Sequence, residues 1–346
     1  MTDPVLTVDG LRTHLQTENG VVRAVDGLSF TVGGGETVCL VGESGSGKTI
    51  ACDSITGLVG PPAEISGDVR FGDTELLSAS ERELRAIRGD SLAYLFQNAQ
   101  NALDPVYTVG DQIAEAITFH RDVSNEAARE RAIDLLQTVG LSRASERVDE
   151  YPHELSDGMC QRVAIAIALA AEPDLLIADE PTSALDVMIQ ARIVDLLAEL
   201  RSTHDLSLLL VTHDLRVVAA LADRIVVLYG GTAVERGPAT DVLERPSHPY
   251  TQELFRSFAG ERGRRNRPRS REGIPVEGCR FHQECPHVVD ACKHTRPAFE
   301  PVEDRETHHV ACVYHGDDYD DSTVMAEVKS TSEFDIDTST GGERDD

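Results

Sequence analysis

A glycine-rich loop near the N-terminus constrains this chain more than any other feature. The loop Gly42-Glu43-Ser44-Gly45-Ser46-Gly47-Lys48-Thr49 follows an apolar run at residues 37–41 and precedes a helix-like stretch at residues 50–58. This is the context that a phosphate-binding P-loop requires. The glycines let backbone N–H groups turn toward a polyphosphate, and the helix N-terminus adds its positive dipole. We therefore predict a nucleoside triphosphate site in which Lys48 contacts the β- and γ-phosphates and Thr49 supplies a hydroxyl to Mg²⁺.

The charge balance narrows the partners of this site. The 346 residues include 60 acidic and 32 basic side chains, which gives a net charge of −28. Such an excess disfavours binding to nucleic acid through the general surface. It also suits a protein dissolved in molar salt, where the screening length falls to about 3 Å. We expect a halophilic source, with an acidic surface kept for ordinary solubility as the alternative.

Neither a secretion signal nor a membrane span is expected. Residues 1–9 have no basic region followed by an apolar one, and no window reaches about 18 consecutive apolar residues. We therefore expect the protein in the cytoplasm or peripherally on the cytoplasmic face of a membrane. The seven cysteines then indicate free thiols or metal ligands rather than disulfides.

Strand and helix signals alternate along most of the chain. Short β-like runs between Val5 and Phe30, and again at residues 65–71, predict an antiparallel portion beside the loop. Downstream, apolar strand-like runs alternate with helical stretches, which predicts a mostly parallel α/β core. Helical spacing is clearest at residues 108–120 and 124–139, with Ser124 as a helix start, and a further helix is expected from Cys160 to Ala171.

These patterns divide the chain into five segments. Residues 1–97 are assigned to the β subdomain and P-loop core, and residues 98–160 to a helical subdomain. Residues 161–260 form the second part of the core. Residues 261–315 are a linker with a four-cysteine extension, and residues 316–346 an acidic disordered tail. Six arginines between Arg262 and Arg271 indicate the linker, with a contact to acidic lipid or RNA as the alternative. From Asp317 onward the tail is too polar to bury a core.

An acidic pair completes the predicted nucleotide site. The apolar strand-like run at residues 175–178 ends in Asp179 and Glu180. A carboxylate delivered beside the P-loop strand is placed to hold the Mg²⁺ shell, which we assign to Asp179. Glu180, one residue further on, is placed to orient and deprotonate the attacking water.

With these residues in place, the chain resembles the ATP-binding subunit of an ABC transporter over roughly residues 5–258. The family's signature segment, usually Leu-Ser-Gly-Gly, appears as Leu155-Ser156-Asp157-Gly158. The Q-loop glutamine matches Gln97, the D-loop matches Ser183-Ala184-Leu185-Asp186, and the switch histidine matches His213. The resemblance implies a P-loop NTPase (RecA-like) α/β core with antiparallel β and helical subdomains.

The resemblance also implies a composite site shared by two such domains. Each P-loop would clamp ATP against the partner's signature segment, so that Ser156 and Gly158 would meet a γ-phosphate held by the other subunit. Gln97 would sense Mg²⁺ or water and relay that state to the helical subdomain. His213 would contact the γ-phosphate, and Asp186 would act across the dimer.

Two positions depart from the family pattern. Asp157 replaces the first glycine of the signature, and two like charges ~5 Å apart at an effective dielectric constant of ~20 repel by about 3 kcal/mol. Against this, a carboxylate before the Cys160 helix caps N–H groups favourably, so both tolerance and one crippled site stay open. The second departure is the adenine-stacking aromatic, for which His14 and Val22 are the candidates.

Flanking segments narrow the resemblance to the di- and oligopeptide permease ATPases, and within them to the D-type subunit. They are residues 151–156, 184–191, 246–251 and 278–286. Implied partners are a second homologous ATPase in a heterodimer, two transmembrane permease subunits and an extracellular peptide-binding protein. Nickel importers share much of this pattern and stay as the alternative. The other rivals are a soluble ABC ATPase without a permease and a regulator that no longer hydrolyses ATP.

Four C-terminal cysteines form a candidate metal site. Cys279, Cys285, Cys292 and Cys312 suit tetrahedral Zn²⁺ or an iron–sulfur cluster, and Cys285-Pro286 is typical of a cluster ligand. The resemblance implies a [4Fe-4S] cluster, with zinc and unligated thiols as alternatives. The remaining three cysteines are expected to be packing residues.

Overall fold

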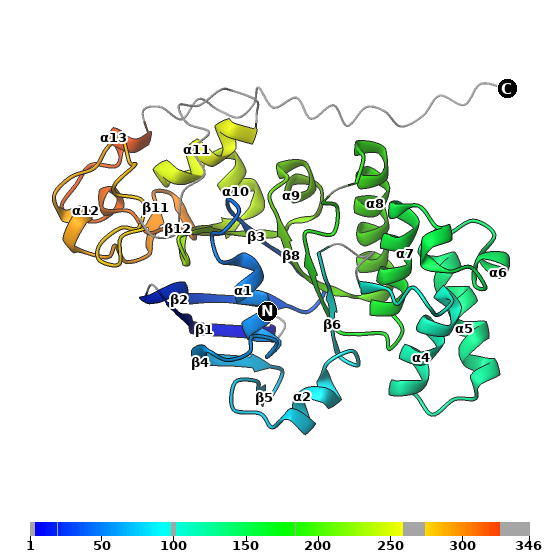
Figure 1. The fold of residues 1–346 in the computed structure, drawn as a ribbon. Helices are drawn as coiled ribbons and strands as arrows, with labels where there is room; N and C mark the ends of the chain where they lie inside the picture. The colour runs from blue at the N-terminus through cyan, green and yellow to red at the C-terminus, as the bar shows by residue number, and fades with distance from the viewer. Residues whose placement is uncertain (1–3, 19, 98–101, 184, 259–273, 326–346) are drawn as a thin grey trace, which may run out of the picture.

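Two β-sheets organise the computed structural model, which describes residues 4–18, 20–97, 102–183, 185–258 and 274–325 (Figure 1). The smaller sheet is antiparallel, with the order β2-β1-β4-β5. Its strands are Gly20–Gly33, Pro4–Thr17, Ala63–Phe71 and Thr74–Glu75. This sheet is the predicted antiparallel portion, although the two N-terminal strands are each 14 residues long rather than short runs.

The larger sheet has eight strands in the order β11-β12-β10-β9-β3-β8-β7-β6. It is parallel from β9 through β6 and antiparallel from β9 to β11. In that order its strands are Glu300–Val302, Arg305–Val310, Thr232–Pro238, Arg224–Tyr229, Thr37–Val41, Ser207–Thr212, Leu175–Asp179 and Leu92–Leu95. β3, β7 and β8 are buried along their whole length, which explains why they are nearly continuous apolar runs.

Helices cover the parallel sheet and form a separate group beside it. In chain order, the helices are α1 Lys48–Ile55, α2 Glu81–Ile87, α4 Val109–His120, α5 Asn125–Thr138, α6 Ala144–Arg147, η1 Pro152–Glu154, α7 Asp157–Ala168, α8 Val187–His204, α9 Leu215–Leu221, α10 Ala239–Glu244, α11 Pro249–Phe258, α12 Ala291–His294, η3 Val313–His315 and α13 Ser322–Met325. Among the described parts of the chain, no helix is long and apolar enough to cross a membrane.

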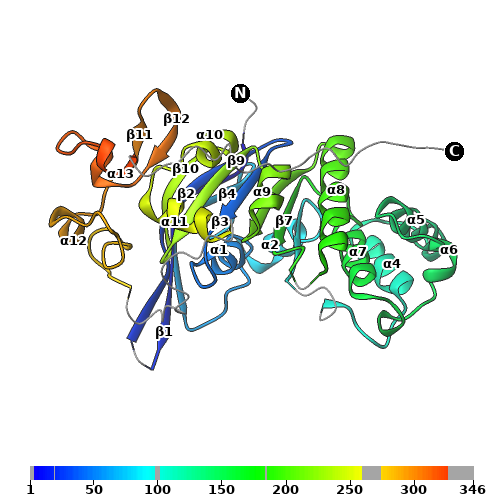
Figure 2. The same ribbon diagram turned by 90° about the horizontal axis from the view of Figure 1, so that it is seen from above.

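The group α4 to α7 covers the stretch in which the helical subdomain is predicted, although α7 continues to Ala168, and it lies at the opposite end of the molecule from the C-terminal elements (Figures 1 and 2). Its apolar faces meet through Ile113, Ala132 and Leu136, which are fully buried. Ser124 caps α5 as predicted, since its hydroxyl accepts a hydrogen bond from Ala127 N at 3.2 Å.

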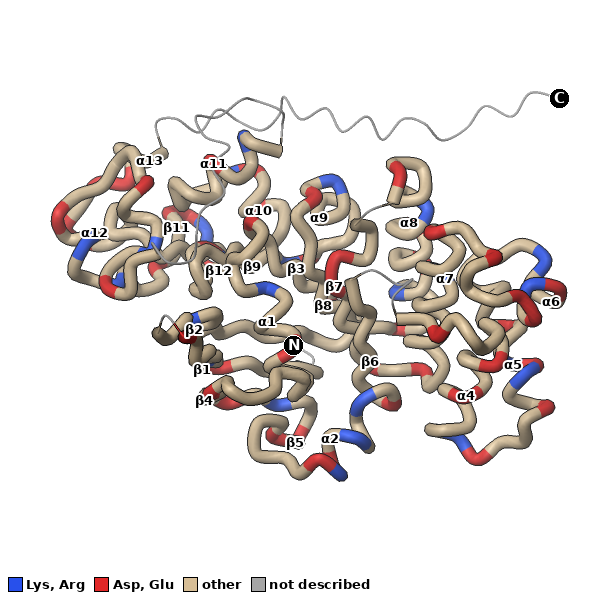
Figure 3. Tube along the Cα trace, viewed as in Figure 1, with Lys and Arg blue, Asp and Glu red and all other residues tan. Residues whose placement is uncertain are grey.

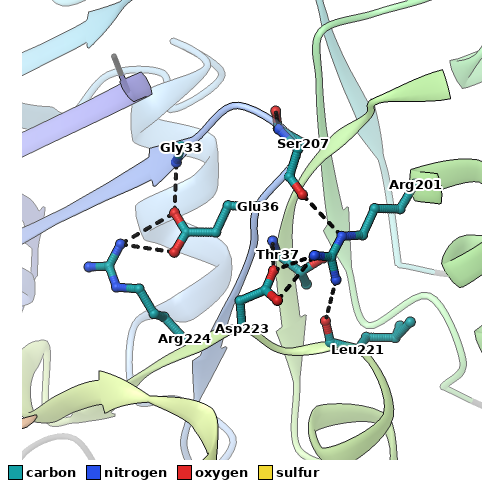
Figure 4. A network of polar contacts seen from close by, with 9 residues as sticks. Gly33, Glu36, Thr37, Arg201, Ser207, Leu221, Asp223 and Arg224 are labelled. Atoms are coloured by element: carbon teal, nitrogen blue, oxygen red, sulfur yellow. Dashed lines mark hydrogen bonds and ion pairs between the residues drawn. The ribbon is translucent and has the colours of Figure 1, made fainter. Parts of the chain in front are cut away.

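Polar contacts fix the edge of the sheet that lies away from the P-loop (Figure 4). Asp223 accepts a hydrogen bond from Thr37 N at 2.8 Å and pairs with Arg201 at the end of α8. Beside it, Glu36 accepts from Gly33 N at 2.7 Å and pairs with Arg224 at the start of β9. These bonds tie the starts of β3 and β9 together. Because β9, β3, β8 and β7 are parallel, their carboxyl ends all lie at the opposite end of the sheet.

The C-terminal segment, defined here as residues 274–325, packs onto the large sheet through β12 and β10. The acidic tail was predicted to begin at residue 316, and this start is wrong because α13 lies within the tail. Val324 of α13 is fully buried in a small separate core with Val302, Val310, Cys312 and Tyr314. Residues 326–346 of the tail and the arginine-rich linker at residues 262–271 lie outside the described residues.

Acidic side chains are spread over all parts of the trace rather than gathered on one element (Figure 3). This distribution agrees with an acidic surface of general character. The halophilic source stays a prediction.

Candidate functional site

The P-loop joins the end of β3 to the start of α1, as predicted. Lys48 is the first residue of α1 and is 5% exposed, and its Nζ donates to the carbonyl oxygens of Gly42 at 2.7 Å and Glu43 at 2.9 Å. Burial lowers the pKa of Lys48, and the charges of Glu180 and Asp179 oppose that shift. The ammonium group therefore sits inside the loop, close to both predicted acids.

Two glycines of the loop leave no room for a side chain. Gly47 has φ +107°, and a Cβ atom there would lie 2.3 Å from Ala24 O. At Gly42 a Cβ atom would lie 2.4 Å from Leu228 O. The loop packs this closely against backbone carbonyl groups of neighbouring strands, which explains the glycine at each position.

Asp179 and Thr49 fit a magnesium ion. Asp179 ends β7 with 1% exposure, and the Thr49 side chain forms a hydrogen bond with it. Burial is the main cause of a raised Asp179 pKa, which the bond to Thr49 opposes. Asp179 Oδ1 is buried without a hydrogen-bond partner among the described residues. A hydroxyl and a carboxylate oxygen without a partner, side by side, are the ligand chemistry that Mg²⁺ prefers.

Glu180 is the meeting point of the other predicted catalytic residues. Gln97 Nε2 donates to Glu180 Oε2 at 2.8 Å, and His213 Nδ1 lies 3.1 Å from Oε1. Glu180 has φ +46°, a strained backbone for a non-glycine residue, and its N–H is held by Val211 O at 2.9 Å. Three distant parts of the sequence therefore converge on one carboxylate.

The two partners shift each other's pKa. The hydrogen bond from His213 is the largest cause of the lowered pKa of Glu180, and burial opposes it. The same hydrogen bond raises the pKa of His213. The arrangement keeps Glu180 ionised and favours a protonated His213.

A cavity of about 460 Å³ lies over the loop. Its lining joins P-loop residues to Gln97, Glu180 and His213, and adds Leu254, Ser257 and Phe258 from α11. The contribution of α11 to the cavity lining was not predicted, because the Pro249-Tyr250 pair at the start of this helix is by itself typical of a turn. A larger hollow between α2 and α4 is lined by none of the predicted catalytic residues.

The signature segment lies elsewhere, at the start of α7. Ser156 is the N-cap residue and its hydroxyl makes no capping bond, while Gly158 is packed so tightly that a Cβ atom would lie 2.6 Å from Ile189 Cγ2. Asp157 is exposed and is the first helical residue. The expected helix start at Cys160 is wrong by three residues, because the signature itself forms the first turn. None of these three residues lines the cavity of its own chain.

Asp186 has a local structural partner. It is the N-cap of α8, and its Oδ1 accepts a hydrogen bond from Ile189 N at 3.0 Å. Ala184 of the same D-loop lies outside the described residues. The predicted role of Asp186 across a dimer stays a prediction.

Neither adenine candidate reaches the cavity lining. His14 lies on β1 with Nε2 3.7 Å from Asp26 Oδ1, and Val22 pairs with Leu15 in the β1–β2 hairpin. The cavity instead exposes an aromatic ring at Phe258.

The four C-terminal cysteines are neighbours in space. Burial is the main cause of the raised pKa of Cys312, about 12, and the other three thiols add to it. Cys279 N donates to Cys292 O at 2.8 Å, and burial raises the pKa of Cys279 to about 11. However, no three His, Cys, Asp or Glu side chains of the described ranges are grouped closely enough to hold a metal ion. The thiols converge without forming a coordination shell.

The comparisons with known proteins agree with this geometry. The family model "ABC transporter" matches residues 25–183, and the model "Oligopeptide/dipeptide transporter, C-terminal region" matches residues 234–292. The chain is 42% identical over 307 residues to the dipeptide transport ATP-binding protein DppD of Escherichia coli (strain K12), across 87% of this chain and 94% of that protein. The chain belongs to the ABC transporter ATP-binding proteins.

Two further relatives support the assignment to this ATPase family. The oligopeptide transport ATP-binding protein AppD of Bacillus subtilis (strain 168) is 43% identical over 302 residues, across 85% of this chain and 92% of that protein. The ATP-binding cassette MJ0796, solved as a dimer in a post-hydrolysis state bound to ADP and Pi, matches with a TM-score of 0.62 at 28% identity. That match covers 68% of this chain and 98% of the cassette. The predicted P-loop ATPase fold and the ATPase activity are thereby confirmed.

Proposed function

We propose that this chain is the ATP-hydrolysing subunit of an ABC importer for dipeptides or oligopeptides, peripheral on the cytoplasmic face of the cell membrane. The observation that carries the proposal is the similarity to peptide-transport ATPases across nearly the whole chain, which extends into the C-terminal region. Its partners would be two membrane permease subunits, a peptide-binding protein and a second, homologous ATPase.

The residues of the cavity support a defined division of labour. The P-loop N–H groups and Lys48 bind the polyphosphate of ATP. Thr49 and Asp179 would hold Mg²⁺, which neutralises charge on the β- and γ-phosphates when bound. Glu180, kept ionised by His213, accepts a proton from the attacking water. As the water oxygen bonds to the γ-phosphorus, the bond from that phosphorus to the bridging oxygen breaks and ADP leaves.

Gln97 and His213 act on the same carboxylate from two sides. Gln97 donates to one oxygen and His213 lies against the other, so both orient Glu180. His213 also lines the cavity, where it would exchange this contact for the γ-phosphate. We propose that Gln97 reports this change to the helical subdomain that follows it.

The position of the signature segment supports a composite site. Ser156, Asp157 and Gly158 line no part of the chain's own cavity, which is expected if they face the nucleotide of a second subunit. We propose that Asp157 is tolerated there. Its support is the exposed position in the first turn of α7, where the helix dipole favours a carboxylate.

We also propose that Cys279, Cys285, Cys292 and Cys312 hold a [4Fe-4S] cluster. The support is that the four thiols lie near one another, with Cys292 and Cys312 buried and Cys279 and Cys285 partly buried. Cluster binding would require these thiols to move from their described positions into ligand distance and to ionise. Anaerobically purified protein is expected to contain iron and acid-labile sulfide. If the protein contains zinc instead of iron and sulfide, the four cysteines form a zinc site rather than a cluster. If it contains neither metal, they are unligated thiols.

The substrate class can be tested with the complete importer. We expect peptides to stimulate ATP hydrolysis when this chain is reconstituted in liposomes with its permease subunits, its second ATPase and its binding protein. Nickel salts, given in place of peptide, are expected to have no effect. Stimulation by nickel but not by peptide would contradict the proposed substrate.

A further inference from the structure

Three consecutive residues of the C-terminal segment reach the supports of the P-loop. Cys279 Sγ lies 4.0 Å from His248 Nε2, next to the start of α11. Arg280 pairs with Asp26 on β2, and Phe281 packs against Tyr250 and Tyr229. Arg280 is 5% exposed and Phe281 is fully buried, so these contacts lie inside the protein rather than on its surface.

Tyr250 carries one of these contacts into the loop itself. The Glu43 N–H donates to Tyr250 Oη at 3.0 Å. The ring of Tyr250 is 1% exposed, and its centroid lies 4.6 Å from that of Tyr229 and 5.5 Å from that of Phe281. The backbone N–H of Tyr250 donates to His248 Nδ1 at 3.0 Å. Close packing against the rings of Tyr229 and Phe281 holds the Tyr250 hydroxyl in place beside the loop.

Asp26 carries the second contact. Its N–H donates to Gly231 O at 2.7 Å, and the Gly231 N–H donates to Ser46 O at 2.9 Å. The Asp26 carboxylate is 4% exposed, and Arg296 lies 3.6 Å from it in addition to Arg280. Burial raises the pKa of Asp26, but the arginines outweigh burial and the net pKa is lowered. The ion pair therefore ties the C-terminal segment to the far end of the loop.

We propose that the C-terminal segment braces the P-loop at two points, through Tyr250 at Glu43 and through the Arg280–Asp26 pair at Ser46, and that Tyr250 is a positioning residue for nucleotide binding. Because Arg280 and Phe281 are adjacent, the two points move as one unit. Gly278 supports this rigidity, since a Cβ atom there would lie 2.3 Å from Cys292 O. The packing of the cysteine region then sets the shape of the phosphate site. This inference rests on ATP binding and is independent of the transported substrate.

Matched pairs of variants in the full-length protein test the brace. Tyr250→Phe removes the hydroxyl at Glu43, while Tyr314→Phe removes a hydroxyl that donates to His287 O at 2.9 Å inside the C-terminal segment, away from the loop. Arg280→Lys weakens the pair with Asp26, while Arg305→Lys makes the same change in a pair with Asp241 on α10, away from the loop. A fluorescent ATP analogue with Mg²⁺ reports the dissociation constant of each variant, and circular dichroism reports its folding.

We expect Tyr250→Phe to weaken nucleotide binding about 2- to 10-fold, the size of one hydrogen bond. Arg280→Lys should weaken binding in the same direction, and both controls should change it less than about twofold. The double variant Tyr250→Phe/Arg280→Lys should lose less than the product of the two single losses, because the two contacts belong to one unit. Unchanged binding in folded Tyr250→Phe, equal losses in the Tyr314→Phe control, or a fully multiplicative double variant would overturn the proposal.

Discussion

The carboxyl edge of the parallel sheet and the C-terminal segment are built on different principles. At the sheet edge, the predicted catalytic residues lie at or just beyond the ends of buried strands, as Glu180 follows β7 and His213 follows β8. In the C-terminal segment, short elements depend on contacts to residues far away in the chain, such as Arg280 with Asp26. The predicted catalytic residues at the sheet edge are therefore placed by the sequence next to them, whereas the C-terminal segment is placed by contacts with residues far away in the chain.

The largest effect is expected from a substitution in the P-loop, at the carboxyl edge of the sheet. Gly47→Ala places a methyl group 2.3 Å from Ala24 O at φ +107°, so the loop has to change shape. We expect nucleotide binding to disappear while the fold, measured by circular dichroism, is retained. Binding at the wild-type level would show that the loop adapts and that the close approach is not required.

The matching change in the C-terminal segment is Gly278→Ala. Its Cβ atom meets Cys292 O at φ +68°, and a strained backbone costs about 1–3 kcal/mol. We expect the free energy of unfolding, measured in urea, to fall by this amount with nucleotide binding weakened rather than lost. Complete loss of binding would remove the distinction between a chemical region and a supporting one.

Asp157→Gly is expected to have a smaller effect. Loss of a carboxylate from the first turn of α7 should lower the free energy of unfolding by about 0.3–1 kcal/mol, because the helix dipole favours that charge. ATP turnover of the assembled ATPase pair should stay close to that of the wild type. A large rise in turnover would instead identify Asp157 as inhibitory, and Asp157→Asn would then show the same rise.

The smallest effect concerns the pair of Glu180 with His213. The pKa of His213 is raised above 6.5, so the stability that the pair contributes is present below pH 6.5 and is lost as the pH rises through the folded pKa. The pKa of Glu180 is lowered below 4.5, so its own contribution is present above pH 4.5 and is lost as the pH falls through the folded pKa. Thermal melts of wild type and His213→Gln should converge at alkaline pH. A constant difference from pH 6 to pH 9 would contradict the assignment.

The sequence predicted a residue's position where that position depends on its place after a strand or before a helix. The positions of the P-loop, Asp179, Glu180 and the Ser124 cap follow from this order, because strand–loop–helix order is a local property; the catalytic roles of Asp179 and Glu180 stay predictions. It failed where the partner is remote, since nothing near Tyr250 in the sequence points to Glu43, 207 residues away. The start of α7 was misplaced because Asp157 was expected to cap the helix from outside, whereas Ser156 is the N-cap and Asp157 is the first helical residue.

The most direct test of the account is to measure ATP binding and ATP turnover together for Glu180→Gln. The amide keeps the shape of the side chain but cannot accept the proton from water, and general-base catalysis contributes about 10²–10⁴-fold. The account predicts that turnover falls within this range while the dissociation constant for ATP stays close to that of the wild type. Unchanged turnover, or a loss of binding equal to the loss of turnover, would contradict the claim that Glu180 is the base at this site.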